Sequence, residues 1–427
     1  MGHSDIHRAI EAVWRIESAK LIAALARITR DVGVAEELAQ DALVAALEQW
    51  PESGIPDKPG AWLMATAKHR AIDQLRHRKM QQHKHAEIGR EMELQQELAD
   101  EAFEAAVEDE LGDDLLRLIF TACHPVLATE ARVAMTLRLL GGLTTPEIAR
   151  AFLVPEATVA QRIVRAKRTL AEARVPYELP RAAELSLRLA SVLEVIYLVF
   201  NEGYSATAGD DWLRPALCQD ALRLGRILAE LATQEPEVHG LIALMELQAS
   251  RFGARVGPAG EPVLLLDQDR TRWDHLLVQR GLAALKRAED LGGGLGPYVL
   301  QAEIAACHAV APTAADTNWS RIVALYDALA QILPSPVVEL NRAVAVSMAL
   351  GPAAGLELVD QLKDEPALRN YHLLPSVRAD LLMKLGRLAE AREEFLRAAA
   401  MTANVRERGL LLERAAVCSP EHRPATH

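Results

Sequence analysis

The hydrophobic and polar positions of residues 143–170, LTTPEIARAFLVPEATVAQRIVRAKRTL, predict two short helices joined by a tight turn. The first helix would run over 145–152, and the second would begin near Glu156. Small and aliphatic residues would form the inward faces, with the spacing of a helix-turn-helix: Ile148, Ala149, Phe152, Val159 and Ile163. Donors suited to DNA base edges and phosphates would cover the outward face of the second helix. They are Thr158, Gln161, Arg162, Arg165 and Arg168, with Lys167 at the edge.

Helical periodicity also covers the N-terminal part of the chain. It predicts helices over 6–30, 34–50 and 61–80, with a loop rich in proline and glycine over 51–60. The second helix has an acidic outward face, which by itself indicates only a solvated surface. The third begins beside Trp62 and ends in a run of basic residues. Such a run more often marks solvent exposure than DNA contact, so it adds weight only in combination with other motifs.

The rest of the chain divides by composition. From 91 to 114 there are 11 acidic residues and no basic ones, which predicts an acidic linker. Residues 180–418 are rich in Ala and Leu, lack the alternation of strands and are punctuated by Gly and Pro. This pattern predicts a stack of antiparallel helices. We therefore predict an all-α protein with four parts, at 1–90, 91–114, 115–178 and 179–427.

A repeat of about 35 residues in the C-terminal part is typical of tetratricopeptide (TPR) solenoids. Residues 381–404 match that pattern best, and fainter copies lie before Gly351 and over 319–334. The matching positions in the best copy are Gly386, Leu388, Ala391, Phe395 and Ala398. Stacked repeats leave a concave face, which is a candidate site for a signalling ligand or protein.

Composition narrows the class of protein. With 427 residues, 50% hydrophobic and 25% charged, the chain has the balance of a soluble protein with two or three domains. The sequence has no apolar run of about 20 residues and no signal pattern, so we expect a cytoplasmic protein without a membrane partner. The 4 cysteines lack paired spacing, which favours buried thiols over disulfides or zinc, and we expect no metal or cofactor. The net charge of −12 conceals a local surplus, because residues 115–178 carry 9 basic and 5 acidic residues.

Three of these stretches occur in an order typical of one family. Residues 35–50, AEELAQDALVAALEQW, resemble the core-polymerase-binding helix of bacterial extracytoplasmic-function (ECF) sigma factors. Residues 62–79 resemble the helix of that family that binds the −10 promoter element, and 143–170 resemble its −35-binding helix-turn-helix. The resemblance implies that the chain binds core RNA polymerase and promoter DNA and catalyses no reaction itself. It also implies that the acidic linker threads the active-site cleft and RNA-exit path of the polymerase.

The resemblance assigns roles to individual residues. Core polymerase would be bound by Glu36, Glu37, Leu38 and Asp41. The −10 element would be bound by Trp62, Lys68, His69, Arg70, Arg76 and Arg78. The −35 element would be bound by Thr145, Thr158, Gln161, Arg162, Arg165, Lys167 and Arg168. His69 stands where the family usually has Asn, and Leu153-Val154-Pro155 replaces its usual Gly-aliphatic-Ser turn, so the −10 preference and the turn geometry are expected to differ.

Two polar islands interrupt the C-terminal helical pattern, FNEGYSATAGDDW at 200–212 and LLLDQDRTRWD at 264–274. They resemble motifs of the ECF subgroup with a TPR-like extension, called group 42, and this implies that the extension replaces a separate anti-sigma protein. The regulatory residues would be Asn201, Glu202, Gly203, Tyr204, Asp267, Asp269, Arg270 and Trp273. The residues themselves favour ion pairing between the aspartates and the neighbouring arginines.

Two other functions fit parts of the sequence. A helix-turn-helix transcriptional regulator with a TPR-type sensor would bind duplex DNA without polymerase, but it leaves the basic helix after Trp62 unexplained. An enzyme in the C-terminal part would use Glu202, Asp267 and Asp269 as acid, base or metal ligands. No nucleophile and base pair or nucleotide-binding loop in the sequence supports the enzyme.

Overall fold

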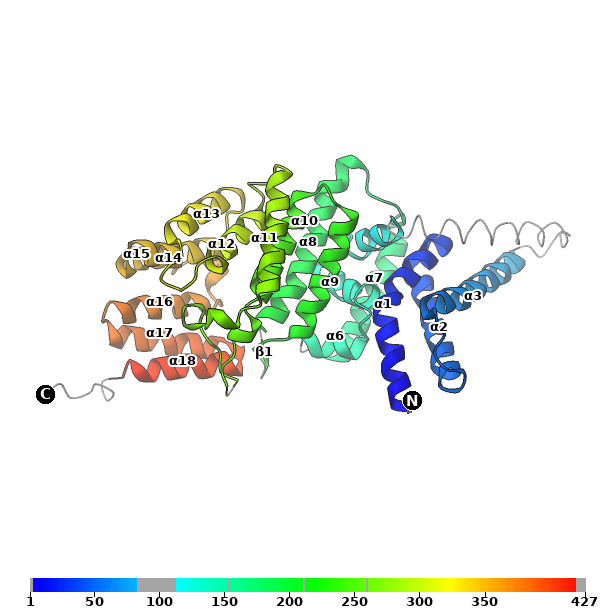
Figure 1. Cartoon of the computed structure of the whole chain (residues 1–427), viewed down its shortest axis with the longest axis horizontal. Coiled ribbons are helices and arrows are strands. Elements are labelled where there is room, and N and C mark those ends of the chain that lie inside the picture. The colour runs from blue at the N-terminus through cyan, green and yellow to red at the C-terminus, as the bar shows by residue number, and fades with distance from the viewer. Residues whose placement is uncertain are drawn as a thin grey trace. The chain divides into compact units, whose positions relative to one another are not determined.

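A computed structural model of the chain describes residues 3–82, 113–152, 154–206, 208–209, 212–258 and 260–419 (Figure 1). Most of the predicted acidic linker and the turn residue Leu153 lie outside these residues. The chain forms two compact units, Met1–Leu198 and Val199–His427. The prediction of an all-α fold is confirmed, since the described elements are helices apart from one pair of two-residue strands.

The first unit begins with α1 (His3–Thr29), α2 (Val32–Ser53) and α3 (Pro59–Gln82), which pack against one another. Asp31 caps α2 by accepting hydrogen bonds from the backbone N–H groups of Gly33 and Val34. The helix continues past Pro51 and ends at Gly54, whose φ of +83° is readily adopted only by glycine. For residues 72–82 of α3 the helix is described but the side chains are not.

A helical stretch over 113–122 is followed by α5 (Thr129–Leu139), α6 (Thr145–Phe152) and α7 (Glu156–Glu172). The start of α6 has a capping box, in which the Glu147 carboxylate accepts from the N–H and the hydroxyl of Thr144, each at 2.7 Å. Helices α6 and α7 have the bounds that the amphipathic pattern predicts. The helix α8 (Ala182–Tyr204) contains the last residues of the first unit and the first of the second.

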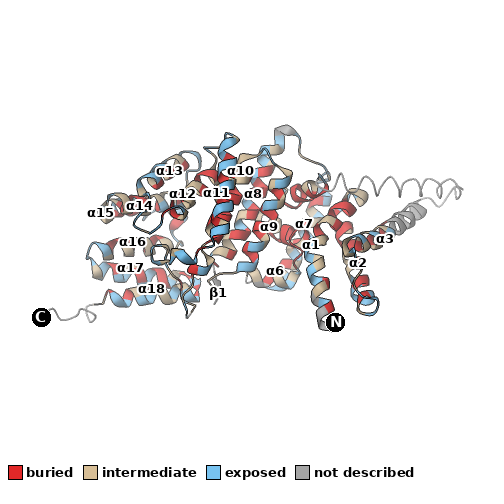
Figure 2. Cartoon of the chain, viewed as in Figure 1, coloured by how far each residue is buried: buried red, intermediate tan, exposed pale blue. Residues whose placement is uncertain are grey.

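The second unit continues as a chain of helices: α9 (Pro215–Leu231), α10 (Pro236–Ala249), α11 (His275–Asp290), α12 (Pro297–Ala309), α13 (Trp319–Ile332), α14 (Pro336–Leu350), α15 (Pro352–Gln361), α16 (Leu373–Lys384), α17 (Leu388–Met401) and α18 (Val405–Val417). Short 3-10 helices intervene, η1 (Phe252–Ala254), η2 (Leu265–Asp267), η3 (Arg270–Arg272) and η4 (Pro366–Leu368). From α12 onward, each long helix packs against the next in the sequence (Figure 1). Buried and exposed residues alternate as stripes along these helices, as expected for a stack with an apolar interior (Figure 2).

Glycine turns make the hairpins of this stack. Gly351 joins α14 to α15 with a φ of +100°, and Gly386 joins α16 to α17 with a φ of +77°. The predicted repeat positions Ala391, Phe395 and Ala398 are fully buried in one apolar cluster with residues of the neighbouring helices. The repeat in the sequence therefore has two structural causes. Glycine is needed at the turn, and small or aromatic residues are needed where neighbouring helices pack.

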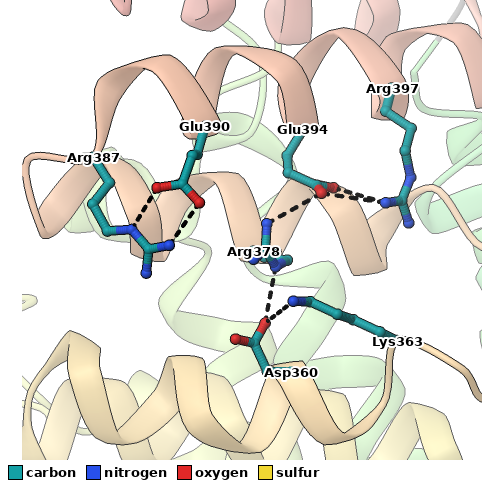
Figure 3. A network of polar contacts seen from close by, with 7 residues as sticks. All are labelled: Asp360, Lys363, Arg378, Arg387, Glu390, Glu394 and Arg397. Carbon is teal, nitrogen blue, oxygen red and sulfur yellow. Dashed lines mark hydrogen bonds and ion pairs between the residues drawn. The ribbon is translucent and has the colours of Figure 1, made fainter.

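A buried arginine connects three helices of the stack (Figure 3). Arg378 on α16 donates from Nε to Asp360 on α15 at 2.9 Å and from a terminal nitrogen to Glu394 on α17 at 3.2 Å. Lys363 and Arg397 complete the network at its edges. Burial raises the pKa of Asp360, but hydrogen bonds from Lys363 and Arg378 outweigh it, so the pKa lies below its usual value. Through Arg378, this network links helix α16 to both of its neighbours, α15 and α17.

A short parallel strand pair joins the two ends of the second unit. The strands β1 (Ala208–Gly209) and β2 (Ala403–Asn404) pair in the register Ala208 with Ala403. The Asn404 side chain donates to the Ala206 carbonyl at 3.1 Å, and its oxygen accepts from the N–H groups at the start of α18. Sequence periodicity could not predict this pairing, because strands of two residues have no recognisable pattern.

Candidate nucleic-acid interface and C-terminal site

The helix α7 has one buried face and one polar face, as its sequence predicts. Val159, Ile163, Ala166 and Leu170 are buried against the rest of the first unit. Of the predicted −35 residues, Gln161, Arg165 and Arg168 are exposed, while Thr158, Arg162 and Thr145 are half-buried. The exposed set provides amide and guanidinium donors along one side of a helix, as a major-groove reader requires.

Lys167 lies in a different place from its predicted neighbours. Its Nζ is 2.6 Å from a carboxylate oxygen of Glu36 on α2. The other oxygen of Glu36 accepts from Arg138 Nε on α5 and from Gln40 Nε2, both at 2.6 Å. Glu36 is only 3% exposed. A predicted polymerase-binding residue and a predicted −35 residue thus form one ion-pair cluster within the first unit.

Further contacts join the same two parts of the first unit. Arg15 on α1 pairs with Glu147 on α6 at 3.0 Å, and Arg27 pairs with Asp114 at 3.0 Å. The Tyr177 hydroxyl lies 3.0 Å from the Ala23 carbonyl, which accepts its hydrogen bond. Burial, reinforced by the nearby Asp114 carboxylate, raises the pKa of Tyr177. The N-terminal helices and the helix-turn-helix are therefore packed together in this state of the chain.

The other predicted polymerase-binding residues on α2 divide between surface and core. Glu37 and Asp41 are exposed, whereas Leu38 is buried in the helix interface. Asp41 lies 3.7 Å from Arg70 on α3, and both side chains are largely exposed. Such a pair contributes little to stability and leaves both groups accessible to a partner.

The helix α3 carries the predicted −10 residues. Trp62 packs edge-on against the buried Trp50 ring, with 5.3 Å between the ring centroids. Lys68 is half-buried, and His69 and Arg70 are exposed. Arg76 and Arg78 lie on the same helix, but their side chains are outside the described part. The helix α3 therefore begins with the packed Trp62 ring and carries the exposed Arg70 further along.

The first C-terminal island lies at the end of α8. Glu202 pairs with Arg214 at 2.6 Å, so its carboxylate is already neutralised by a neighbouring cation. Gly203 is required by packing, because a Cβ there would lie 2.7 Å from the sulfur of Cys218 on α9. The Asn201 carbonyl accepts from the Ser205 N–H, and the Tyr204 ring stacks on Phe200.

The second island does not form the ion pairs that its sequence favours. Asp269 caps η3 and Asp274 caps α11, so both carboxylates accept backbone N–H groups. Arg270 donates to the carbonyls of His308 and Ala311 at the end of α12 instead of to an aspartate. Asp267 is exposed. The expectation was wrong because these aspartates begin helical turns, where unpaired backbone donors compete for them.

Tyr204, Arg270 and Trp273 are brought together with two arginines that the sequence analysis missed. Arg251 lies between Tyr204 and Trp273, and the Arg255 guanidinium lies 3.6 Å from the Tyr204 ring centroid. The sequence does contain a signal for these two residues. Arg251 and Arg255 flank Gly253 in an otherwise apolar stretch, where a cation is unusual. Arg138, the other missed residue, stands in an apolar helix pattern where a cation needs a buried partner.

Within the described ranges, no three His, Cys, Asp or Glu side chains are grouped so that they could hold a metal ion. Likewise, none of the helices in the described ranges combines the length and the apolar character needed to cross a membrane.

Comparison with known proteins finds separate family matches for three parts of the chain. Residues 16–80 match the family model "Sigma-70 region 2", and residues 117–170 match "Sigma-70, region 4". Residues 188–289 match a family of unknown function, DUF6596. The chain is 43% identical over 389 residues to an uncharacterized protein of Rhizobium meliloti (strain 1021), covering 90% of each. No solved structure matches the chain.

Proposed function

Because the chain belongs to the sigma-70 family of transcription initiation factors and carries a DUF6596 extension, we propose that it is an ECF-type sigma factor controlled by that extension. The observation that carries the proposal is the arrangement of the matched regions. Region 2 ends at residue 80 and region 4 begins at residue 117, so 81–116 are the whole connection between them. This order and close spacing agree with the resemblance to ECF sigma factors that the sequence shows.

In this proposal the exposed residues act as the sequence predicts. Glu37 and Asp41 on α2 contact core polymerase, and α3 holds the −10 strand with its cations. The exposed side of α7 reads the −35 element in the major groove. The exposed carboxylates on α2 and the exposed donors on α7 support this assignment, because each group would gain a partner in the initiation complex.

The packing of region 2 against region 4 has to change before the chain can act at a promoter. The −35 and −10 elements are about 25 base pairs apart, which is roughly 85 Å of B-DNA. A compact unit of 198 residues has a radius of gyration of about 16 Å and is therefore only roughly 40 Å across. Residues 81–116, if fully extended, could reach at most about 130 Å, which is enough to span the two elements.

We therefore regard the Glu36 cluster as part of a closed state. Glu36 on the polymerase-binding helix and Lys167 on the −35 helix neutralise each other at 2.6 Å, so neither is available to its predicted partner. Binding of core polymerase would release this pair and separate the two regions. The favourable contacts of the complex must then exceed the cost of breaking a buried ion pair.

Run-off transcription tests the function directly. The purified chain with core polymerase should produce a specific transcript from the promoter upstream of its own operon, and core polymerase alone should not. If no promoter of that region responds and the chain does not co-purify with core polymerase, the alternative of a helix-turn-helix regulator with a sensor domain gains support.

To test whether the extension controls activity, the chain must be truncated at a point that leaves the first unit intact. Ending the chain at residue 178 would remove Ser191 and Glu194, which both bind Arg132 in region 4. Ending it at Leu198 retains these contacts. We expect the 1–198 chain to differ from the full chain in transcription, while equal activity of the two would contradict control by the extension.

A further inference from the structure

Six side chains of the second unit form an alternating stack of arginines and aromatic rings, which we call the arginine–aromatic ladder. In order, its members are Trp212, Arg255, Tyr204, Arg251, Trp273 and Arg270. The successive distances from guanidinium carbon to ring centroid are 5.7, 3.6, 5.6, 6.0 and 5.0 Å. Every distance is within about 6 Å, the range of attraction between a cation and a ring face. The ladder joins segments that are distant in the sequence, all within residues 188–289.

The ladder contains buried donors without acceptors. The Nε atoms of its three arginines and the Nε1 atoms of its two tryptophans are shielded from solvent and lack a hydrogen-bond partner in the described part of the chain. Arg255 is only 8% exposed and Trp273 only 5%. Native proteins satisfy nearly all such groups, so a concentration of five N–H donors in one place requires an explanation.

The positive charge of the ladder is also unbalanced. Within the described ranges, no ion pair joins these three guanidinium groups to a carboxylate. The nearby acids have other partners, since Glu202 pairs with Arg214 and Asp274 caps α11. Asp316, whose charge acts on Arg270, accepts from the N–H and the hydroxyl of Thr313. Burial, aided by repulsion from Arg251, lowers the pKa of Arg255, but a guanidinium remains charged at neutral pH. Burying such charges without a counter-ion is unfavourable.

From these donors and charges we propose that the ladder is the binding site of a small ligand carrying a carboxylate or phosphate group. Guanidinium groups bind such oxyanions through paired hydrogen bonds, and the indole N–H groups offer further donors. An oxyanion beside Arg255 and Arg251 would give acceptors to the nearest of these donors and would offset their charge, whereas a neutral or cationic ligand would not offset it. The site is independent of the sigma function, because no residue of the first unit takes part in it.

Ligand binding would act on the whole second unit. The Ala206 N–H donates to the Trp212 carbonyl at 2.9 Å, which fixes the ladder segment directly beside β1. Strand β1 pairs with β2, and Asn404 of β2 caps α18. A ligand that holds Tyr204 and Trp212 in place therefore also stabilises the closure between the first and last elements of the unit.

Thermal unfolding of the full chain with defined anions tests the site. The probes are inorganic phosphate, phenyl phosphate, acetate and benzoate, each compared with sodium chloride at equal ionic strength. Arg255→Met removes the buried cation and keeps an apolar stem, Arg251→Gln weakens the half-buried donor, and Arg392→Met removes an exposed cation of α17 as the matched control. Tryptophan fluorescence gives a second measurement, because two of the 6 tryptophans belong to the ladder.

We expect at least one probe to raise the unfolding midpoint of the wild-type chain saturably, and the better probes to identify phosphate or carboxylate as the preferred group. Arg251→Gln should bind at least tenfold more weakly, Arg392→Met should bind normally, and Arg255→Met should lose the response without losing stability. Absence of a saturable response in the wild-type chain would overturn the proposal. An undiminished response in both ladder variants would place the anion elsewhere and overturn it equally.

Discussion

Glu36 holds two cations at once, Arg138 and Lys167, in a nearly solvent-free position. Removing either cation takes a close hydrogen-bond partner away from a carboxylate that water hardly reaches. The cluster therefore stabilises the closed first unit and also provides a point where that state can be weakened selectively. Arg138 suits this purpose because it is not among the predicted DNA-binding or polymerase-binding residues.

Arg138→Met should destabilise the first unit and favour its opening. We expect a loss of about 1–3 kcal/mol in the free energy of unfolding, because Glu36 retains Lys167 as a partner. The variant should also bind core polymerase more tightly than the wild-type chain, since less energy is needed to release Glu36. Denaturant unfolding and a binding titration measure the two effects. Arg392→Met is the control, and unchanged polymerase affinity in Arg138→Met would contradict the closed state.

His308 makes the second unit sensitive to acid. Burial, together with the positive charges of Arg251 and Arg270, lowers its pKa from 6.5 to about 4, and the ring packs edge-on against Trp319. Between these two values the unfolded chain binds the proton and the folded chain does not. The contribution of His308 is therefore present above pH 6.5 and is lost as the pH falls towards 4.

The size of this effect is on the order of 3 kcal/mol, since each unit of pKa shift corresponds to about 1.4 kcal/mol. Denaturant unfolding at pH 7, 6, 5 and 4 should show the wild-type chain losing this amount relative to a His308→Phe variant. A constant difference between the two proteins over that pH range would mean that the pKa of His308 is not lowered.

At the scale of single elements, Arg378 links three helices and its removal should be costly. Arg378→Ala would leave Asp360 and Glu394 without their shared cation, and we expect a loss of about 2 kcal/mol because Asp360 is partly solvated. Arg397→Ala removes an exposed cation from the same network and should cost under about 1 kcal/mol. Equal unfolding midpoints for the two variants would show that burial does not determine the contribution of this network.

The −35 helix α7 gives a test of DNA recognition that is separate from folding. Arg162→Ala and Arg165→Ala should each weaken promoter binding by about 1–3 kcal/mol if they contact base edges. The variants change residues that contribute little to the buried face of the helix, so their unfolding should resemble that of the wild-type chain. The holoenzyme with Arg392→Ala is the control in a promoter-binding titration, and unchanged affinity in both variants would place the recognition surface elsewhere.

Elements with a strong local pattern could be predicted from the sequence, and contacts between distant elements could not. Helices α6 and α7 follow from apolar spacing and from Pro155 at the start of the second helix, and the turns at Gly351 and Gly386 follow from their residue type. The partners of Glu36 and the strand pair between 208 and 403 depend on tertiary packing, which leaves no periodic signal. The same holds for the arginine–aromatic ladder, whose members come from three separate segments.

At the scale of the whole molecule, the proposed cycle requires regions 2 and 4 to separate, and a reversible cross-link can test this requirement. The side chains of Arg15 and Glu147 meet at 3.0 Å in the closed first unit, so cysteines at these positions could be joined by a short reducible linker. The four native cysteines are buried, and burial raises the pKa of Cys123 to about 11, so they should react slowly with thiol reagents.

The cross-linked Arg15→Cys, Glu147→Cys chain should give no run-off transcript, because a closed unit roughly 40 Å across cannot reach promoter elements roughly 85 Å apart. Reduction of the linker should restore transcription to the level of the uncross-linked double variant, and each single-cysteine variant treated with the same reagent should remain active. Full activity of the cross-linked chain would mean that region 4 need not leave region 2, and the Glu36 cluster would then be a stabilising contact of the active state.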